Sequence, residues 1–252
     1  MNSLARSEQS AASATDFGWR LDERLAREDW SAIGRSLQDV GHAVLPEVLT
    51  AEESRSLAAM YPDDQKFRSH IVMASHGFGR GEYKYFAYPL PSLIATVRQK
   101  LYPYLAVIAN QWNASLNYHE RFPEVHDDYL AKCHAAGQTR PTPLLLQYVA
   151  GDFNALHQDL YGDMFFPLQT AILLAQPGKD FEGGEFVMSD SVAAGSRVEV
   201  VPLEQGDAVI FAVRERPVPG TRGMRRAASR HGVSRVRSGL RHTTGIIFHD
   251  AR

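Results

Sequence analysis

A histidine and a carboxylate that could hold a metal ion stand two residues apart in His157-Gln158-Asp159. In an extended strand successive side chains point to opposite faces, so His157 and Asp159 would share one face, roughly 6.6 Å apart along the backbone. A second histidine would complete the two-histidine, one-carboxylate set that binds non-haem Fe(II) and leaves coordination positions open. The sequence offers His231 for this role. We therefore expect His157, Asp159 and His231 to be both the metal ligands and the catalytic residues.

A second group of side chains could bind a carboxylate beside that metal. Arg241 follows His231 by ten residues, beyond a Ser238-Gly239 turn, so the two can lie on adjacent strands. Its guanidinium could hold a carboxylate through a bidentate pair. Alternation places Thr243 on the face of Arg241, and Tyr148, at the end of the strand before the metal motif, needs a hydrogen-bond partner if it is buried. We expect Arg241, Tyr148 and Thr243 to bind a co-substrate.

The second half of the chain has the pattern of a β-barrel or sandwich. After Pro143, short apolar segments follow one another between Gly, Pro and Asp residues. They cover residues 144–149, 168–175, 185–189, 198–201, 208–213, 231–236 and 240–248. Strands of this length and spacing indicate a jelly roll. We predict a double-stranded β-helix, cupin-like, over residues 143–252 as the catalytic core.

The first half reads as mainly helical. Apolar positions recur at helical spacing within residues 16–48, and Thr50 with Glu53 forms a capping box. A third helix is expected over residues 92–112, whereas residues 119–140 fit either helix or loop. We predict a disordered leader at residues 1–15, a helical region at 16–142 packed on the barrel, and an overall α+β fold that is mostly β.

Composition limits the classes of function. The chain is 44% hydrophobic and 22% charged with a formal net charge of -2, which is ordinary for a globular protein and gives no general attraction to polyanions. The single cysteine, Cys133, excludes an internal disulfide framework and fits a reducing compartment. No apolar run approaches the ~20 residues that span a bilayer, and no signal peptide is recognisable. We expect a cytoplasmic protein with no membrane partner.

Arginines concentrate around the second histidine. Between residues 214 and 241 there are nine of them, against the single acid Glu215. They are Arg214, Arg216, Arg222, Arg225, Arg226, Arg230, Arg235, Arg237 and Arg241. A basic loop from Arg214 to Arg237 could contact the phosphates of a nucleic acid. It could equally be a solvated loop, or one that pairs with the chain's own acids.

Two groups of aromatic residues also allow two interpretations each. The segment with Tyr83, Tyr85, Phe86 and Tyr88 could stack an extruded nucleobase, or it could simply cover the barrel. The pair at positions 165 and 166 could line the substrate pocket or fill the core.

Seven separated motifs, taken in order, resemble those of the Fe(II)- and 2-oxoglutarate-dependent dioxygenases across the C-terminal half. These are Tyr148, Gly151, His157-Gln158-Asp159, Gly183-Gly184-Glu185-Phe186, residues 206–211, His231 and Ser238-Gly239-Leu240-Arg241. The resemblance implies that the two histidines and the aspartate bind Fe(II) and that Arg241 holds the distal carboxylate of 2-oxoglutarate. It also implies that O2 and 2-oxoglutarate are consumed to oxidise a C–H bond, with release of succinate.

Two branches of that superfamily share features with the chain. Tyr148-Val149-Ala150-Gly151 and the metal motif look like AlkB-type alkylation-repair dioxygenases, whereas His231-Gly232-Val233 and the Arg241 motif look like prolyl hydroxylases. The pattern as a whole, with residues 81–86 and 246–251, is similar to an uncharacterised bacterial family predicted to act oxidatively on damaged nucleic acid.

We therefore predict an Fe(II)- and 2-oxoglutarate-dependent dioxygenase, with oxidative dealkylation of damaged nucleic acid as the first candidate reaction. Hydroxylation of a protein side chain or a small molecule is the alternative. A non-catalytic sensor that binds metal and 2-oxoglutarate, and a cupin-like zinc or manganese protein, are further readings that the sequence leaves open.

Overall fold

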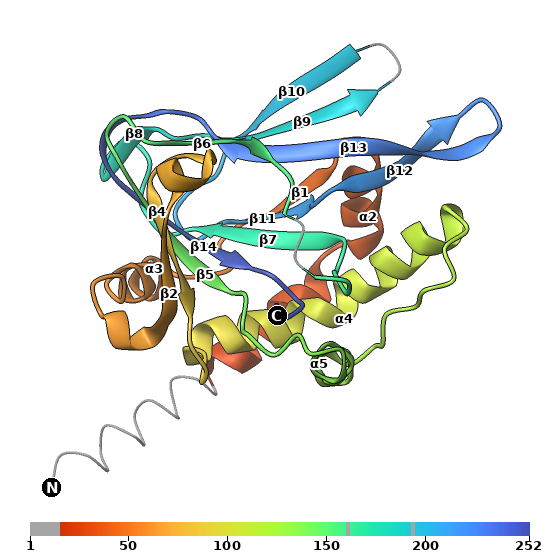
Figure 1. Cartoon of the computed structure of the whole chain (residues 1–252), viewed down its shortest axis with the longest axis horizontal. Helices are drawn as coiled ribbons and strands as arrows, with labels where there is room; N and C mark the ends of the chain where they lie inside the picture. Colours follow the sequence, from red (N-terminus) through yellow and green to blue (C-terminus); the bar gives the residue numbers. More distant parts are fainter. Residues whose placement is uncertain (1–15, 160–161, 193–194) are drawn as a thin grey trace, which may run out of the picture.

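Two antiparallel sheets form the centre of the computed structural model, which describes residues 16–159, 162–192 and 195–252 (Figure 1). The larger sheet has the order β1-β11-β7-β14-β5-β4-β2, with β8 paired to β14. The smaller sheet has the order β10-β9-β13-β6-β3, with β12 paired to β13. This arrangement confirms the predicted double-stranded β-helix.

The strands of the larger sheet are β1 (His42–Leu45), β2 (Phe67–Val72), β4 (Glu82–Phe86), β5 (Leu144–Val149), β7 (Leu168–Leu173), β8 (Phe181–Gly183), β11 (Ala208–Ala212) and β14 (Val236–Ile246). Those of the smaller sheet are β3 (Gly79–Arg80), β6 (Phe153–His157), β9 (Phe186–Val192), β10 (Gly195–Val201), β12 (Glu215–Gly220) and β13 (Gly223–Val233).

Helices cover the larger sheet. A helix over residues 16–27 precedes α2 (Trp30–Asp39), α3 (Ala51–Ala58), α4 (Ser92–Ser115) and α5 (His126–Ala135), and short 3-10 turns lie at η1 (Asp64–Lys66) and η2 (Met73–His76). The capping box of Thr50 and Glu53 is present at the start of α3, as predicted. The segment 119–140, which fitted helix or loop, contains α5.

The main hydrophobic core lies between α4 and the larger sheet. Leu101 and Leu105 of α4 are fully buried in one cluster with Ile172, Ile210 and Ile246 of the sheet. Burial of side chains of this size contributes about 1.5–3 kcal/mol each. The long helix therefore supports the strands of the larger sheet.

The first half of the chain contributes strands as well as helices. β1 pairs with β11 and β4 with β5 in the larger sheet, and β3 pairs with β6 in the smaller one. Region 16–142 is thus woven into both sheets rather than only packed on them, and a domain boundary at residue 143 stays a prediction. The leader predicted at residues 1–15 lies outside the described residues.

The arginine-rich segment is a β-hairpin, so the prediction of a basic loop was wrong. β12 and β13 pair from Glu215↔Ala228 to Gly220↔Gly223, and the hairpin projects beyond the sheets (Figure 1). Pro217 and Pro219 argue against a strand because proline cannot donate to the ladder. They are accommodated here because β12 pairs only with β13 among the described strands, and edge strands tolerate proline.

Within the described ranges, the search for bilayer-spanning helices finds none with the required length and apolar character.

Candidate metal centre

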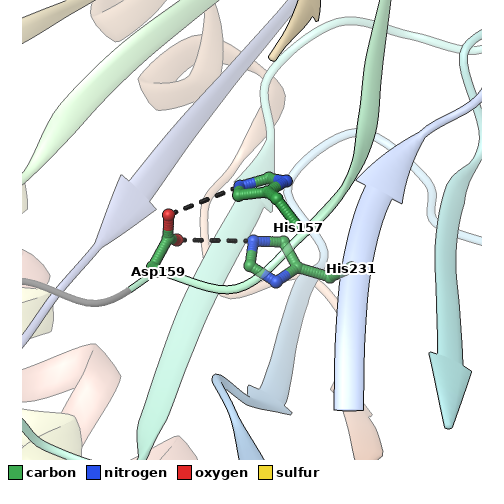
Figure 2. Close-up of side chains that lie close together, drawn as sticks. All are labelled: His157, Asp159 and His231. Carbon is green, nitrogen blue, oxygen red and sulfur yellow. Dashed lines mark ion pairs between the residues drawn. The ribbon is translucent and has the colours of Figure 1, made fainter. Parts of the chain in front are cut away.

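Two neighbouring strands place the two histidines side by side. His157 ends β6, and His231 lies opposite it in the antiparallel register of β13. Their ring centroids are 4.3 Å apart. Asp159 follows the end of β6, so it reaches the site from the connecting segment. The prediction that His157 and Asp159 lie on one face of the same strand was therefore wrong. Figure 2 shows the carboxylate turned toward both imidazoles.

The distances within this group fit a divalent cation. Nε2 of His157 lies 3.3 Å from Oδ1 of Asp159, and Nε2 of His231 lies 3.4 Å from Oδ2 of the same carboxylate. The three potential ligand atoms lie within 4.8 Å of one another. Nδ1 of His157 donates to the carbonyl oxygen of Ala155 at 2.8 Å. This bond places a proton on Nδ1 and leaves the Nε2 lone pair, on the side of the carboxylate, as the atom that could bind a metal.

The surroundings favour the ligand form of Asp159 and of His231. Burial would raise the pKa of the Asp159 carboxyl, but the hydrogen bonds and charges of His157 and His231 outweigh it and hold that pKa far below its usual range. Burial lowers the pKa of the His231 imidazole and favours its neutral form. A carboxylate anion next to a neutral imidazole is the protonation state that metal binding needs.

A cavity of about 210 Å³ opens beside the three residues, between the two sheets. Tyr148, Arg241 and Thr243 all line it, together with His157, Asp159 and His231, which we call the metal group. The structure therefore brings together in one cavity all six residues that the sequence analysis selected.

Arg241 is buried, and no acidic side chain among the residues that the structure describes pairs with it. Its side chain is 1% exposed, its Nη1 donates to Oγ1 of Thr243 at 2.6 Å, and its Nε has no hydrogen-bond partner among the described residues. Burial lowers the pKa of this guanidinium to about 10, which still leaves it charged at neutral pH. A buried cation without a counter-ion is costly. Its place in the cavity indicates a site for an anion.

Aromatic rings and a glycine fix the position of this guanidinium. It lies 5.5 Å from the ring centroid of Tyr148 and 5.7 Å from that of Phe181. A Cβ on Gly184 would stand 2.8 Å from Cδ of Arg241, so a larger residue would displace the arginine. Tyr148 is fully buried, and burial raises the pKa of its hydroxyl, which therefore remains a hydrogen-bond donor.

Phe78 is a cavity residue that the sequence analysis did not select. It is 42% exposed, its ring centroid lies 6.3 Å from that of His157, and it stacks on His76 at 5.8 Å. It lies between η2 and β3 and lines the cavity beside the metal group. The glycines at 77 and 79 gave the only sequence signal, that of a loop.

The aromatic residues named from the sequence divide between cavity and core. Tyr83 lines the cavity, whereas Phe86 is fully buried in the main core. Tyr88 donates to Asp250 at 2.9 Å, away from the metal group. Phe166 belongs to the main core, and Phe165 lines a separate cavity.

Gln158 ties the metal motif to the basic hairpin. Its Nε2 donates to the carbonyl oxygens of Arg214 and Ser229, at 2.7 and 2.8 Å. Ser229 stands two residues before His231 on β13. The polar residue between His157 and Asp159 thus holds the hairpin in place next to the cavity.

The arginines around the hairpin are mostly exposed. Those on the surface are Arg214, Arg222, Arg226, Arg230, Arg235 and Arg237. Arg226 lies 3.9 Å from Glu215 and Arg237 lies 3.7 Å from Glu185, so part of the charge is neutralised internally. Arg216 is 1% exposed, pairs with Asp190 of β9 and is structural.

Comparison with known families matches most of the chain. Residues 81–251 match the Oxygenase-NA family, described as "Oxygenase, catalysing oxidative methylation of damaged DNA". Two uncharacterized proteins of Mycobacterium tuberculosis, from the CDC 1551 and H37Rv strains, are each 48% identical over 167 residues, which is 66% of this chain and 72% of theirs.

Solved structures share the fold at low sequence identity. A prolyl-4-hydroxylase of Pseudomonas putida superposes with a TM-score of 0.51 and 16% identity, covering 88% of this chain and 99% of that one. An oxidoreductase of the 2OG-Fe(II) oxygenase family from Burkholderia pseudomallei gives a TM-score of 0.52 and 14% identity, covering 89% and 93%. These likenesses show a common architecture.

Proposed function

The chain belongs to the Oxygenase-NA family, and from this premise we propose that its cavity uses Fe(II), 2-oxoglutarate and O2 to oxidise an alkyl group on a damaged nucleobase. The enzyme class, an Fe(II)- and 2-oxoglutarate-dependent dioxygenase, agrees with the family match and with the fold of the 2OG-Fe(II) oxygenases. The nucleobase substrate and the roles of individual residues are the proposal.

The observation that carries the proposal is the buried guanidinium of Arg241, which forms no ion pair within the described part of the chain and lies in the same cavity as His157, Asp159 and His231. We assign His157, Asp159 and His231 to Fe(II). Bound iron would supply the activation of O2. Arg241 and the Thr243 hydroxyl would hold the distal carboxylate of 2-oxoglutarate. A dicarboxylate matches a cationic inner wall next to a metal, because each end of the molecule then meets positive charge.

The reaction balances with these partners. One atom of O2 enters the alkyl carbon, and the other enters succinate as 2-oxoglutarate loses CO2. When the alkyl group is an N-methyl group, the resulting hydroxymethyl group leaves as formaldehyde and the nitrogen regains a proton. The chain's own residues orient the co-substrate and shield the site, which lies between two sheets.

Two features support a nucleic-acid substrate. Exposed arginines gather on the hairpin whose strand carries His231, where phosphates could bind. Phe78, half-exposed at the cavity beside His157, offers a ring on which an extruded base could stack. The family description names damaged DNA.

The test is coupled turnover. Iron-loaded protein, kept with ascorbate, is given 2-oxoglutarate and a single-stranded oligonucleotide that carries N-methylated bases, and both succinate and formaldehyde are measured. We expect the two products in equal amounts and none from the Asp159→Ala variant. Succinate without formaldehyde from any methylated nucleic acid would reject the substrate. Tight 2-oxoglutarate binding without any turnover would favour a sensor.

A further inference from the structure

A second cavity, of about 220 Å³, lies between the end of α4, the segment that leads into β7 and the base of the β12–β13 hairpin. Four aromatic side chains line it, those of Trp112, Tyr118, Phe122 and Phe165. Pockets for drug-sized ligands usually exceed about 300 Å³. This one has room for a single heteroaromatic ring system, between walls that are themselves aromatic.

Polar groups at its entrance are arranged around Tyr118. The hydroxyl of Tyr118 donates to Oε1 of Glu215 at 3.0 Å and accepts from Nη1 of Arg226 at 3.3 Å. Arg226 and Glu215 also lie 3.9 Å apart and so offset each other's charge. These contacts hold the tyrosine ring, which is 37% exposed, at the cavity.

One guanidinium at this cavity is available to an anion. Arg214 is exposed, and its side chain forms no ion pair or hydrogen bond with the described part of the chain. Glu120 also lines the cavity, and burial raises the pKa of its carboxyl. An aromatic site with a free arginine at its edge suits a nucleotide, whose base is planar and whose phosphate is anionic.

The second cavity and the cavity beside His157 are lined by neighbouring residues of the same two strand segments. Phe211 and Gln169 are paired on β11 and β7 and line the metal cavity. Arg214, just after β11, and Pro167, just before β7, line the second cavity. The two segments still pair there, because the backbone N–H of Val213 donates to the carbonyl oxygen of Pro167 at 3.0 Å. Three residues of extended chain span about 10 Å.

We propose that the second cavity binds the nucleobase that flanks the oxidised nucleotide in a single-stranded substrate, with its ring against Tyr118 and Phe165 and its phosphate at Arg214. This inference rests on the proposed nucleic-acid substrate. Lining residues of the two cavities three positions apart on one extended segment have Cα atoms about 10 Å apart, well beyond the 3.4 Å rise of stacked bases, so we expect the strand to be unstacked between the two sites. Extrusion of the target base already requires this. A mononucleotide could fill only one of the two cavities.

The test measures binding, so that it does not depend on turnover. Affinity of the whole protein for a labelled pentathymidylate, and for the same strand without bases, is measured by fluorescence anisotropy at fixed salt. We expect Tyr118→Ala and Phe165→Ala each to weaken binding of pentathymidylate about tenfold, the effect of losing one base–aromatic stack. Binding of the abasic strand should not change. Tyr118→Phe keeps the ring but loses the hydroxyl contacts that hold it, so it should retain most of the affinity that Tyr118→Ala loses.

A matched control is Trp19→Ala, which removes an aromatic side chain that is 62% exposed and lies outside the cavity. Melting temperatures show whether each variant is folded. Wild-type affinity in both alanine variants, an equal loss for the abasic strand, or no binding by the wild-type protein would each overturn the second site. Formaldehyde release with unchanged binding by the variants would keep the proposed reaction and reject this site. Binding that depends on the two rings, without formaldehyde release, would keep this site and reject the proposed reaction.

Discussion

His157 and His231 are direct partners across the β6–β13 ladder, with their ring centroids 4.3 Å apart. A single pair of strands therefore sets the distance between both imidazoles. β13 also pairs with β9 on its other edge, so His231 lies in the interior of the smaller sheet. Strands hold a site more rigidly than loops do, and only the carboxylate of Asp159 depends on a connecting segment.

Asp159→Ala and Arg241→Ala should separate metal binding from co-substrate binding. The first change removes the one anionic ligand, so we expect iron to be lost during purification. The second leaves all three ligands in place, so iron should stay bound while 2-oxoglutarate affinity falls about a hundredfold or more, since loss of one partner of a buried charge pair costs about 2–5 kcal/mol. Iron content by elemental analysis and 2-oxoglutarate binding by calorimetry check both. Equal effects on iron would contradict these roles.

Gly184→Ala should weaken 2-oxoglutarate binding without affecting the metal. A Cβ at this position would stand 2.8 Å from Cδ of Arg241 and 2.9 Å from Cγ2 of Val236, and the backbone has a φ of +62°. The guanidinium must then shift, so we expect the KM for 2-oxoglutarate to rise about tenfold or more, because displacements of about 1 Å have large effects on positioned groups. Gly18→Ala, where the new Cβ meets nothing closer than 3.8 Å, is the control. An unchanged KM in the Gly184 variant would mean that Arg241 is not the clamp.

The grouping of the two histidines with Asp159 could be predicted from the sequence because both histidines stand at strand positions set by alternating patterns. Arg241 and Thr243 likewise share a face by simple alternation along β14, and the structure places them 2.6 Å apart. The contribution of Phe78 could not be predicted. It depends on how a glycine-rich turn folds over His157, which no local pattern specifies.

The hairpin shows a different limit of sequence analysis. Local sequence rules treat Pro217 and Pro219 as signs of a loop, because proline has no backbone N–H to donate. β12 lies at an edge, where an N–H on the unpaired side is not needed for the sheet. The buried ion pair of Arg216 with Asp190 could not be predicted either, because an arginine in a basic run is expected at the surface. Pairing partners far along the chain decide both cases.

Arg222→Ala and Arg230→Ala should weaken nucleic-acid binding equally for all sequences. Both side chains are exposed on the β12–β13 hairpin or its turn, and a phosphate contact carries no base information. Each substitution should reduce the slope of log affinity against log salt concentration by about 1. Arg27→Ala, in the helix at residues 16–27, is the control. If neither hairpin variant changes the salt dependence, the hairpin does not bind phosphates.

The stability of the protein should fall as the pH falls from about 6.5 to about 4, in part because of His126. This side chain is 4% exposed, and its Nε2 donates to the carbonyl oxygen of Phe248 at 2.8 Å. Burial, with the charge of Arg98 in addition, lowers its pKa from 6.5 to about 4 in the folded state. Above pH 6.5 the imidazole is neutral in both states and its contribution is complete. Between the two values only the unfolded chain takes up the proton, so the free energy of unfolding decreases by up to about 3 kcal/mol from this residue.

The share of His126 in that loss can be isolated with His126→Phe, which keeps an aromatic ring beside Tyr102 and Phe248 and cannot titrate. Urea unfolding of the wild type and the variant is followed at several pH values between 4.5 and 7.5. The variant forgoes the hydrogen bond to Phe248, so it should be the less stable protein at pH 7.5. The difference should shrink or reverse toward pH 4.5, because the variant has no proton to take up on unfolding. Titration of the metal ligands contributes equally to both proteins and cancels in the comparison. Parallel stability curves for the two proteins would show that His126 titrates alike in the folded and unfolded states.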